Sequence, residues 1–150
     1  NIERVWKRIL NLKAEKENEV PVGAVLIRDN EIIAKAYNQP ISSNDATAHA
    51  EIQLIKRAGQ NIQNYRLNNT IMYVTLEPCA MCFGAMIHAR IHRVVFGAYD
   101  LKTGVCGSCT NFSNENFFNH KIEISGGVLN QKCKNLLQSF FKSRREHRSI

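Results

Sequence analysis

The sequence has no run of about 18 consecutive apolar residues, the length that marks a membrane-spanning helix, and no internal repeat or low-complexity tract. Proline and tryptophan are scarce, with 3 and 1 among 150 residues. The start, NIERVWKRILNLKAEKENEV, mixes charged and apolar residues like an amphipathic helix, without the apolar core of a secretion signal. We therefore expect a single domain over residues 1–150, with a sizeable buried core and no membrane segment.

Paired cysteines are also missing. The five cysteines are an odd number in a chain whose start does not resemble an export signal. Such a chain is typical of a reducing compartment, so we expect a cytoplasmic protein without structural disulfides.

Acidic residues are the minority, with 13 Asp and Glu against 20 Lys and Arg and a net charge of +7. A modest excess can serve solubility alone. Here much of it lies between residues 132 and 148, where Glu146 alone stands against the basic residues Lys132, Lys134, Lys142, Arg144, Arg145 and Arg148. This concentration favours a polyanionic partner, and nucleic acid is the natural candidate.

Two short motifs carry the chemistry that is present: Thr47-Ala48-His49-Ala50-Glu51 and Glu77-Pro78-Cys79-Ala80-Met81-Cys82. Imidazole nitrogen and thiolate sulfur are ligands that zinc prefers, and catalytic zinc sites keep one of four positions open for water. His49, Cys79 and Cys82 supply three ligands and leave one position open. The motifs therefore predict a catalytic zinc site.

The two cysteines are expected on one helix face. Pro78 suits the first helical position, so we expect a helix to open at Glu77-Pro78. Cys79 and Cys82 would then lie at i and i+3, and both thiols could reach one metal. The positive end of the helix favours their thiolate forms.

His49 is expected at a second helix start, after the capping candidates Asp45 and Thr47, in a helix that stops near Gly59. Glu51 is two residues further on, and such neighbours do not face the same way on a helix. We therefore do not expect His49 and Glu51 to bind the same metal ion. A carboxylate beside the open zinc position could instead take a proton from water and pass it to a leaving group.

Each motif has an alternative interpretation when taken alone. A Cys-x-x-Cys can be a redox pair or half of a structural zinc site, and Cys106-Gly107-Ser108-Cys109 is a second such pair. Together the two pairs could form a four-cysteine module that binds nucleic acid without catalysis. Cys82 and Cys106 are separated by 23 residues, beyond the roughly 15 to 20 typical of such modules. That interpretation also leaves His49 and Glu51 unexplained, so we favour the hydrolytic site.

Hydrophobic periodicity predicts a layered α/β domain with at least part of its sheet parallel. The expected helices cover residues 2–18, the His49 motif, the Cys79 motif and about 130–145. The expected strands are VGAVLIRD and EIIAKAYN, joined as a hairpin at Asp29-Asn30, then residues 70–76, 92–98 and 121–126. Residues 103–116 are expected to form a long loop.

The assembled residues resemble the cytidine deaminase-like superfamily, whose members carry H-x-E followed by P-C-x-x-C. Within it the chain is most similar to the tRNA-specific adenosine deaminases. The resemblance runs nearly end to end, through the blocks VPVGAVL, TAHAEI, NYRL, YVTLEPCAMC, GAMIHARI, RVVFGA, KTG and FFKSRR. It implies a three-layer α/β/α fold, a mixed sheet of about five strands flanked by helices, one Zn²⁺ per chain and a homodimer.

The implied activity is hydrolysis of adenosine to inosine at the wobble position of a tRNA anticodon. The resemblance assigns His49, Cys79 and Cys82 as zinc ligands and Glu51 as the proton shuttle. In that scheme zinc lowers the pKa of its water, and hydroxide adds at carbon 6 of a base flipped from its stack.

The resemblance also places Asn38 against the flipped nucleotide and Asp100 at the substrate backbone, whereas turn formation is the alternative for both. In the terminal helix we favour core packing for Phe140. For Phe141 the alternatives are core packing and stacking on a base, and the adjacent positive charge leads us to assign it, with Arg144 and Arg145, to tRNA. A free guanine, cytosine or nucleotide deaminase is a rival that would not need the basic helix.

Overall fold

The structure is a computed structural model that describes residues 19–148, with side chains described through residue 145. The helix predicted over residues 2–18 lies outside the described residues. Among the helices of the described range, none is long and apolar enough to cross a membrane.

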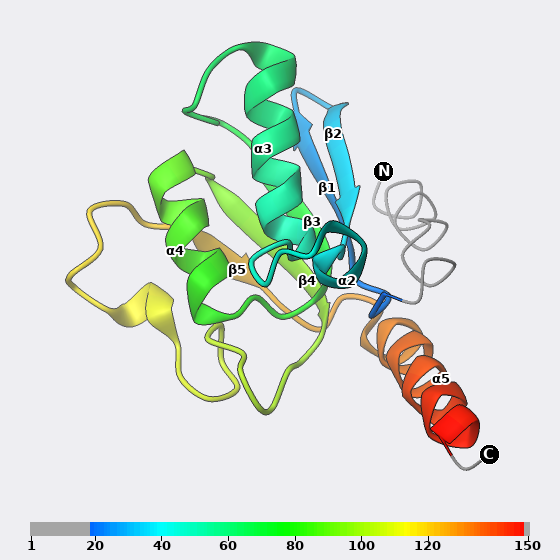
Figure 1. Ribbon diagram of the computed structural model, residues 1–150. Coiled ribbons are helices and arrows are strands. Elements are labelled where there is room, and N and C mark those ends of the chain that lie inside the picture. The colour runs from blue at the N-terminus through cyan, green and yellow to red at the C-terminus, as the bar shows by residue number, and fades with distance from the viewer. Residues whose placement is uncertain (1–18, 149–150) are drawn as a thin grey trace.

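A five-stranded mixed sheet forms the centre of the molecule, in the order β2-β1-β3-β4-β5 (Figure 1). The strands are β1 (Gly23–Arg28), β2 (Glu31–Tyr37), β3 (Ile71–Leu76), β4 (Arg93–Ala98) and β5 (Glu123–Ser125). β1 runs antiparallel to β2 and β3, whereas β3, β4 and β5 are mutually parallel. The predicted α/β class and partly parallel sheet are confirmed, although β5 is shorter than the predicted 121–126.

The hairpin between β1 and β2 turns at Asp29-Asn30, as predicted. Both residues have positive φ, 52° and 63°. Asp and Asn tolerate this left-handed conformation, which a tight hairpin turn requires.

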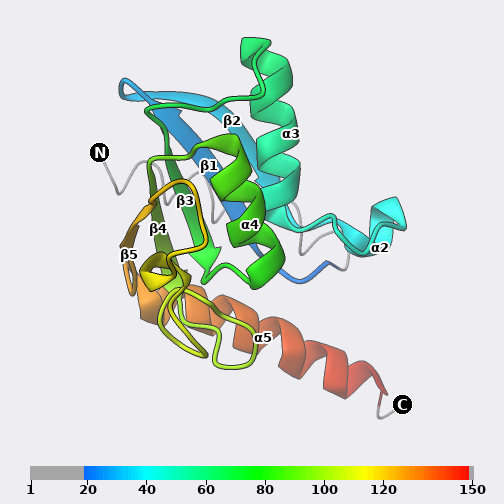
Figure 2. The ribbon, with the colours of Figure 1, turned by 90° about the vertical axis from the view of Figure 1, so that its left-hand side faces the viewer.

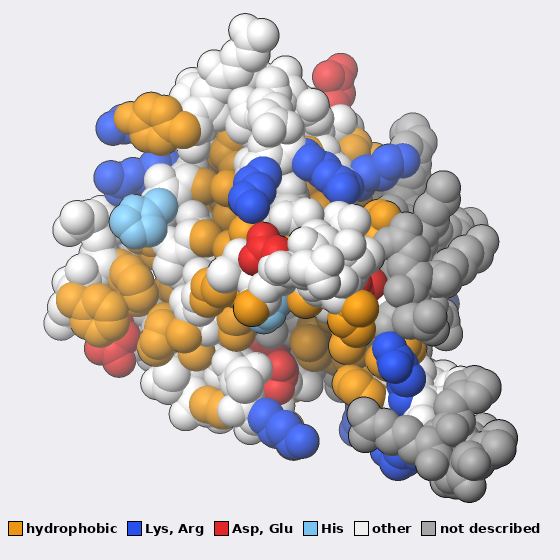
Figure 3. All heavy atoms as spheres, viewed as in Figure 1, with side chains coloured by type: hydrophobic (Ala, Val, Ile, Leu, Met, Phe, Trp, Pro, Cys, Tyr) orange, Lys and Arg blue, Asp and Glu red, His pale blue; other side chains and the backbone are white. Residues whose placement is uncertain are grey.

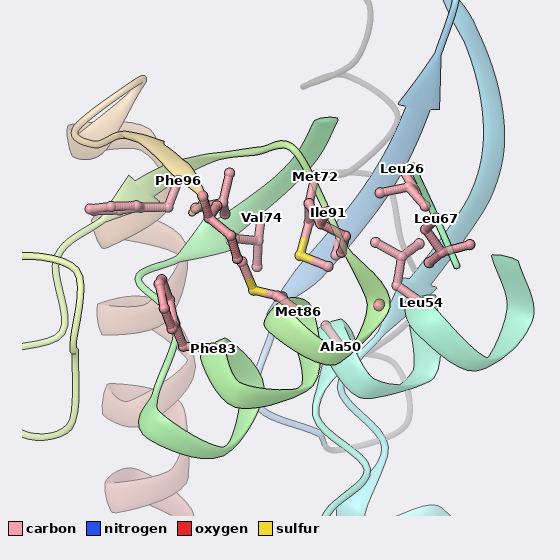
Figure 4. Close-up of a cluster of buried hydrophobic side chains, with 14 of the residues drawn as sticks. Leu26, Ala50, Leu54, Leu67, Met72, Val74, Phe83, Met86, Ile91 and Phe96 are labelled. Carbon is pink, nitrogen blue, oxygen red and sulfur yellow. The ribbon is translucent and has the colours of Figure 1, made fainter. Parts of the chain in front are cut away.

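Both faces of the sheet are covered. Ala24, Leu26, Met72 and Val74 belong to a large apolar cluster. Figure 4 shows the last three of these side chains together with Leu54 of helix α3 (Ala50–Ile62) and Phe83 and Met86 of helix α4 (Ala80–Ala89). Val25 of β1 and Val95 of β4 point to the opposite face, where they join Cys133 of helix α5 (Asn130–Arg148). Figure 2 shows α3 and α4 together on one side of the sheet. This alternation follows from the two-residue repeat of a strand.

Helix α3 is longer than predicted. It passes Gly59 and ends at Ile62, where Gln63 adopts φ 54° and its N–H donates to the Gly59 carbonyl. The prediction of a stop near Gly59 was wrong because a single glycine is tolerated inside a helix, and the left-handed cap residue ends it.

The predicted long loop is confirmed between β4 and β5, broken by a short 3-10 turn at Phe112–Asn114. Phe112 and Phe118 pack their rings against Phe83 of α4, with centroids 5.9 and 5.6 Å away. These contacts fix the far part of the loop on the helix that carries the cysteines.

Helix α5 lies close to β4 because Gly97 has no side chain. A Cβ built at Gly97 would lie 2.4 Å from Cys133 Sγ, closer than van der Waals contact allows. The first turns of α5 are thereby held on the sheet, and its C-terminal half extends away from it (Figure 1).

Candidate active site

The three predicted zinc ligands come together. One ligand atom each from His49, Cys79 and Cys82 lies within 4.8 Å of the others, and no further group of three or more His, Cys, Asp or Glu is found in the described residues. His49 Nδ1 lies 3.7 Å from Cys79 Sγ and 3.5 Å from Cys82 Sγ.

These distances fit a zinc ion. Zinc bonds of about 2.3 Å to sulfur and about 2.0 to 2.1 Å to nitrogen, at a tetrahedral angle, place the two ligand atoms roughly 3.6 Å apart. The observed nitrogen–sulfur separations lie on either side of that value. Because the cysteine sulfurs lie near Nδ1, we infer that this nitrogen is the ligand and that Nε2 carries the ring proton.

Two helix starts converge on the site, as expected, but the residues at each start differ from the prediction. Helix α4 begins at Ala80, so Cys79 is its extended N-cap residue and Cys82 lies in its first turn. The prediction that Pro78 occupies the first helical position was wrong. The Pro78 carbonyl accepts a hydrogen bond from Val105 N, and Cys79 forms a β-bridge with Gly104. This pairing holds residues 78–79 in an extended conformation, so the helix begins only at Ala80.

His49 is itself the N-cap of α3, with φ −65° and ψ 155°. The prediction that Asp45 or Thr47 caps this helix was wrong. Asp45 Oδ1 instead accepts from the backbone N and the hydroxyl of Thr47, which forms a local turn before the helix. Neither His49 nor Cys79 makes a side-chain capping hydrogen bond to its own helix.

Glu51 lies in the first turn of α3, with only 4 % of its surface exposed. Burial raises the pKa of its carboxyl group to about 7, against a partial lowering by a hydrogen bond to its own backbone N–H. A carboxyl group with a pKa near neutrality suits both uptake and release of a proton. Its carboxylate is not part of the three-ligand cluster.

The two thiols are inequivalent. A hydrogen bond from Cys82 lowers the pKa of Cys79 to about 4, whereas the same hydrogen bond and burial raise the pKa of Cys82. Zinc binds cysteine as the thiolate, so both sulfurs would bind the ion in their deprotonated form.

A pocket of about 200 Å³ opens at the cluster. Asn38, which follows β2, and Asp100, which follows β4, both line it together with His49, Glu51 and Cys79. The Asp100 carboxylate also shapes its own turn, accepting from Lys102 N and from the backbone N and hydroxyl of Thr103. The turn formation named as the alternative for Asp100 is therefore confirmed, and Asp100 also lines the pocket.

A second hollow of about 920 Å³ runs along the C-terminal half of α5. We call it the basic groove; its lining residues are Val20, Ile41, Lys102, Gln138, Phe140, Phe141, Lys142, Arg144 and Arg145. Val20 also lines the zinc pocket, so the two hollows adjoin. Figure 3 shows Lys and Arg side chains beside this hollow at the α5 end of the molecule.

Within the groove, Phe140 is buried, as predicted, and Arg144 lies over its ring with the guanidinium carbon 5.3 Å from the ring centroid. Phe141 is 46 % exposed. Phe141, Arg144 and Arg145 therefore share the basic groove and are not among the residues that line the zinc pocket.

The four-cysteine alternative is contradicted. Cys106 is buried and Cys109 is exposed, and neither belongs to the ligand cluster. The Cys109 thiol donates to the Leu101 carbonyl instead. The second pair therefore does not complete a structural zinc site with Cys79 and Cys82.

Sequence reasoning missed several residues around the site. Thr103 lines the zinc pocket, and Lys102 lines the basic groove. Glu77, only 2 % exposed, also lines the zinc pocket. Its available signal was a carboxylate placed directly between a buried strand and the Pro-Cys motif.

The chain matches the family described as cytidine and deoxycytidylate deaminase zinc-binding region over residues 2–98. The match includes His49, Glu51, Cys79 and Cys82, the residues gathered around the pocket. The fold and the site therefore define the class as a zinc-dependent deaminase.

The tRNA-specific adenosine deaminase of Haemophilus influenzae is 48% identical over 151 residues, covering 99% of this chain and 87% of that protein. The chain belongs to the tRNA-specific adenosine deaminase family. A solved structure from studies of A-to-I editing by tRNA:A34 deaminases at the wobble position of transfer RNA has a TM-score of 0.87 at 36% identity, covering 90% of this chain and 99% of the other. A guanine deaminase structure from Bacillus subtilis has a lower TM-score, 0.61, at 40% identity, covering 66% and 65%.

Loss of any ligand should release the metal. We expect wild-type protein to bind about one zinc per chain, and the His49→Ala, Cys79→Ala and Cys82→Ala variants to lose most of it, as measured by elemental analysis after dialysis. Cys109→Ala is the matched control and should keep the zinc, because Cys109 lies outside the cluster. Wild-type metal content in all three ligand variants would contradict this site.

Proposed function

We propose that the chain converts adenosine to inosine by hydrolysis at the wobble position of a tRNA anticodon. The observation that carries this proposal is the adjacency of two hollows: a small pocket at the zinc ligands and a larger groove lined by Lys102, Lys142, Arg144 and Arg145. The pocket, about 200 Å³, is smaller than the roughly 300 to 1,000 Å³ of typical ligand sites. It suits one base, while the groove suits the phosphates of a polynucleotide.

His49, Cys79 and Cys82 would hold the zinc ion. When bound, zinc supplies a Lewis acid that makes water acidic enough to act as a nucleophile near neutral pH. Glu51, held in the buried first turn of α3, accepts in turn the two protons that water gives up, and delivers one to the ring nitrogen and the other to the departing amine. Overall, water replaces the amino group at carbon 6 of adenine, and ammonia leaves.

The remaining predicted contacts divide between the two hollows. Asn38 and Asp100, in the pocket wall, orient the flipped nucleotide and its backbone. Phe141, Arg144 and Arg145, in the basic groove, bind the flanking anticodon nucleotides by stacking and by phosphate contact. A base in an anticodon loop is already partly unstacked, which reduces the free energy needed to flip it.

A free-base deaminase is the rival function, and the Bacillus subtilis guanine deaminase structure shares part of the fold. The basic groove favours the RNA substrate, because a free base carries no phosphate for those cations to bind. We also place the reaction in the cytoplasm, in keeping with five free cysteines; cell fractionation with an antibody would test this.

We further propose that the active form is a homodimer that pairs the outer faces of α4. This helix, AMCFGAMIHA, is apolar nearly all round, and such helices are normally buried on every side. Met81 is nevertheless 38 % exposed, and the small Gly84 and Ala85 beside it allow a second backbone to approach closely. A two-fold interface would cover this face with its own copy.

Replacement of Glu51 tests the reaction itself. Glu51→Gln keeps the size of the side chain but cannot accept the proton, so we expect inosine formation on an anticodon stem-loop to fall by at least about a hundredfold. Zinc content and stem-loop affinity should be retained. The wild-type protein should release little ammonia from free guanine, cytosine or adenosine under the same conditions. Near-normal turnover by the variant would exclude Glu51 as the proton shuttle, and preferred turnover of a free base would exclude the tRNA substrate.

The basic groove predicts a position-dependent effect of charge along one helix. Lys142→Ala with Arg145→Ala should weaken stem-loop binding and reduce its salt dependence, by roughly one released counterion per lost phosphate contact. Lys132→Ala with Lys134→Ala is the matched control, because these exposed lysines lie on the same helix but do not line the groove. Binding is measured by titration at several salt concentrations. Equal losses of stem-loop affinity in the two double variants would show that binding depends on net charge alone and not on the groove.

The dimer is tested by a charge on the outer face of α4. Wild-type protein should sediment as a dimer at micromolar concentration, and Met81→Glu should shift it toward monomer because a charge would be buried against its own copy. Tyr65→Glu, at a position that is 75 % exposed outside this face, is the control and should remain dimeric. A monomeric wild-type protein would rule out the interface.

A further inference from the structure

Glu77 is a buried carboxylate to which the deamination scheme assigns no role. It is the residue between β3 and Pro78-Cys79, and only 2 % of its surface is exposed. Its backbone N–H donates to the Ala98 carbonyl, which continues the pairing of β3 with β4. A carboxylate is costly to bury unless hydrogen bonds replace its water.

Four hydrogen bonds replace that water, and all come from one loop. Glu77 Oε1 accepts from Asp100 N at 3.0 Å and from the Ser108 hydroxyl. Oε2 accepts from Cys106 N at 2.9 Å and from Ser108 N at 3.1 Å. The two oxygens of a carboxylate offer about four acceptor positions, so every acceptor position of Glu77 is occupied.

These bonds tie both ends of the loop from residue 100 to residue 108 to one side chain. Between the tied ends lie Thr103, which lines the zinc pocket, and Lys102, which lines the basic groove. Asp100, at the first tied end, lines the zinc pocket as well. The loop also pairs directly with the zinc motif, through Val105 N to the Pro78 carbonyl and the bridge of Gly104 with Cys79.

Two glycines make this anchorage possible. A Cβ at Gly104 would lie 2.3 Å from Glu77 Cδ, so any side chain there would displace the carboxylate. Gly107 has φ 135°, a conformation that other residues rarely adopt, and it lies between the two residues whose backbone N–H groups converge on Oε2. The second Cys-x-x-Cys thus forms a backbone nest for an internal anion rather than a metal site.

We propose that Glu77 is a positioning residue for the deamination. Its carboxylate holds the loop from Asp100 to Ser108 against the zinc motif, so that the wall of the base pocket and the Lys102 side of the basic groove are in place before RNA binds. This role rests on the proposed function, because it assigns the loop to recognition of the RNA substrate. Preformed binding surfaces avoid the cost of ordering a loop during association.

Glu77→Gln tests the proposal with little change in shape. The amide nitrogen cannot accept, so two of the four donors lose their partner. We expect kcat/KM on an anticodon stem-loop to fall by roughly tenfold or more, mainly through a higher KM, while zinc stays at about one per chain. Amide hydrogen exchange at Asp100, Cys106 and Ser108 should accelerate by roughly tenfold or more, which reports the anchorage without any substrate.

Thr75→Val is the matched control. Thr75 is also 2 % exposed and lies two residues upstream on β3, where its hydroxyl accepts from Gly23 N at 3.1 Å rather than from the loop. It should lose stability but keep the KM and the loop exchange rates of the wild type. Ser108→Ala removes only the hydroxyl donor, so it should raise KM and loop exchange less than Glu77→Gln does. If Glu77→Gln does not fold, Ser108→Ala carries the test.

The proposal is overturned if loop exchange or KM in Glu77→Gln stays at the wild-type value, or if Thr75→Val raises KM equally. With Ser108→Ala as the only folded variant, wild-type exchange and KM would overturn it as well. Failure of the wild-type protein to deaminate the stem-loop would instead overturn the proposed function. Amide exchange would still decide whether Glu77 anchors the loop.

Discussion

Two helix starts that meet at one end of the sheet are the constraint on which the zinc cluster depends. His49 and Cys79 are both extended N-cap residues, and their side chains leave their own helices uncapped and turn toward each other. The positive ends of α3 and α4 then lie beside the thiol groups and favour their ionised form. A shift of either helix start by one residue would rotate a ligand away from the cluster.

The sheet brings a second set of residues to the same place from its opposite face. Helix α5 is fixed on β4 through Cys133 and Gly97, while its C-terminal half continues past the sheet and lines the basic groove, which adjoins the zinc pocket, with Phe141, Arg144 and Arg145. One face therefore supplies the metal ligands, and the other supplies positive charge. A polynucleotide with one extruded base needs both, since the base and its phosphates bind at different surfaces.

Glu51 and Glu77 are two buried carboxylates of the same pocket whose different surroundings suit them to different roles. Glu77 accepts four hydrogen bonds from one loop, which occupy every acceptor position of its side chain. In Glu51, burial outweighs its hydrogen bonds and raises the pKa to about 7. The first carboxylate suits a structural anchor, and the second suits proton transfer.

Local sequence alone determined much of this protein: the apolar alternation of the strands, the Asp29-Asn30 turn, the identity of the three zinc ligands and the basic end of α5. Each of these follows from spacing or from the chemistry of a few neighbouring residues. The positions of the helix starts did not follow, because Pro78 and Cys79 are kept extended by pairing with Gly104 and Val105, some 25 residues away. The sequence also did not predict the four hydrogen bonds that Glu77 accepts, nor that backbone N–H groups of the second Cys-x-x-Cys donate two of them. Only tertiary structure decided them, because hydrogen bonds between distant backbone segments leave no periodic signal in the chain.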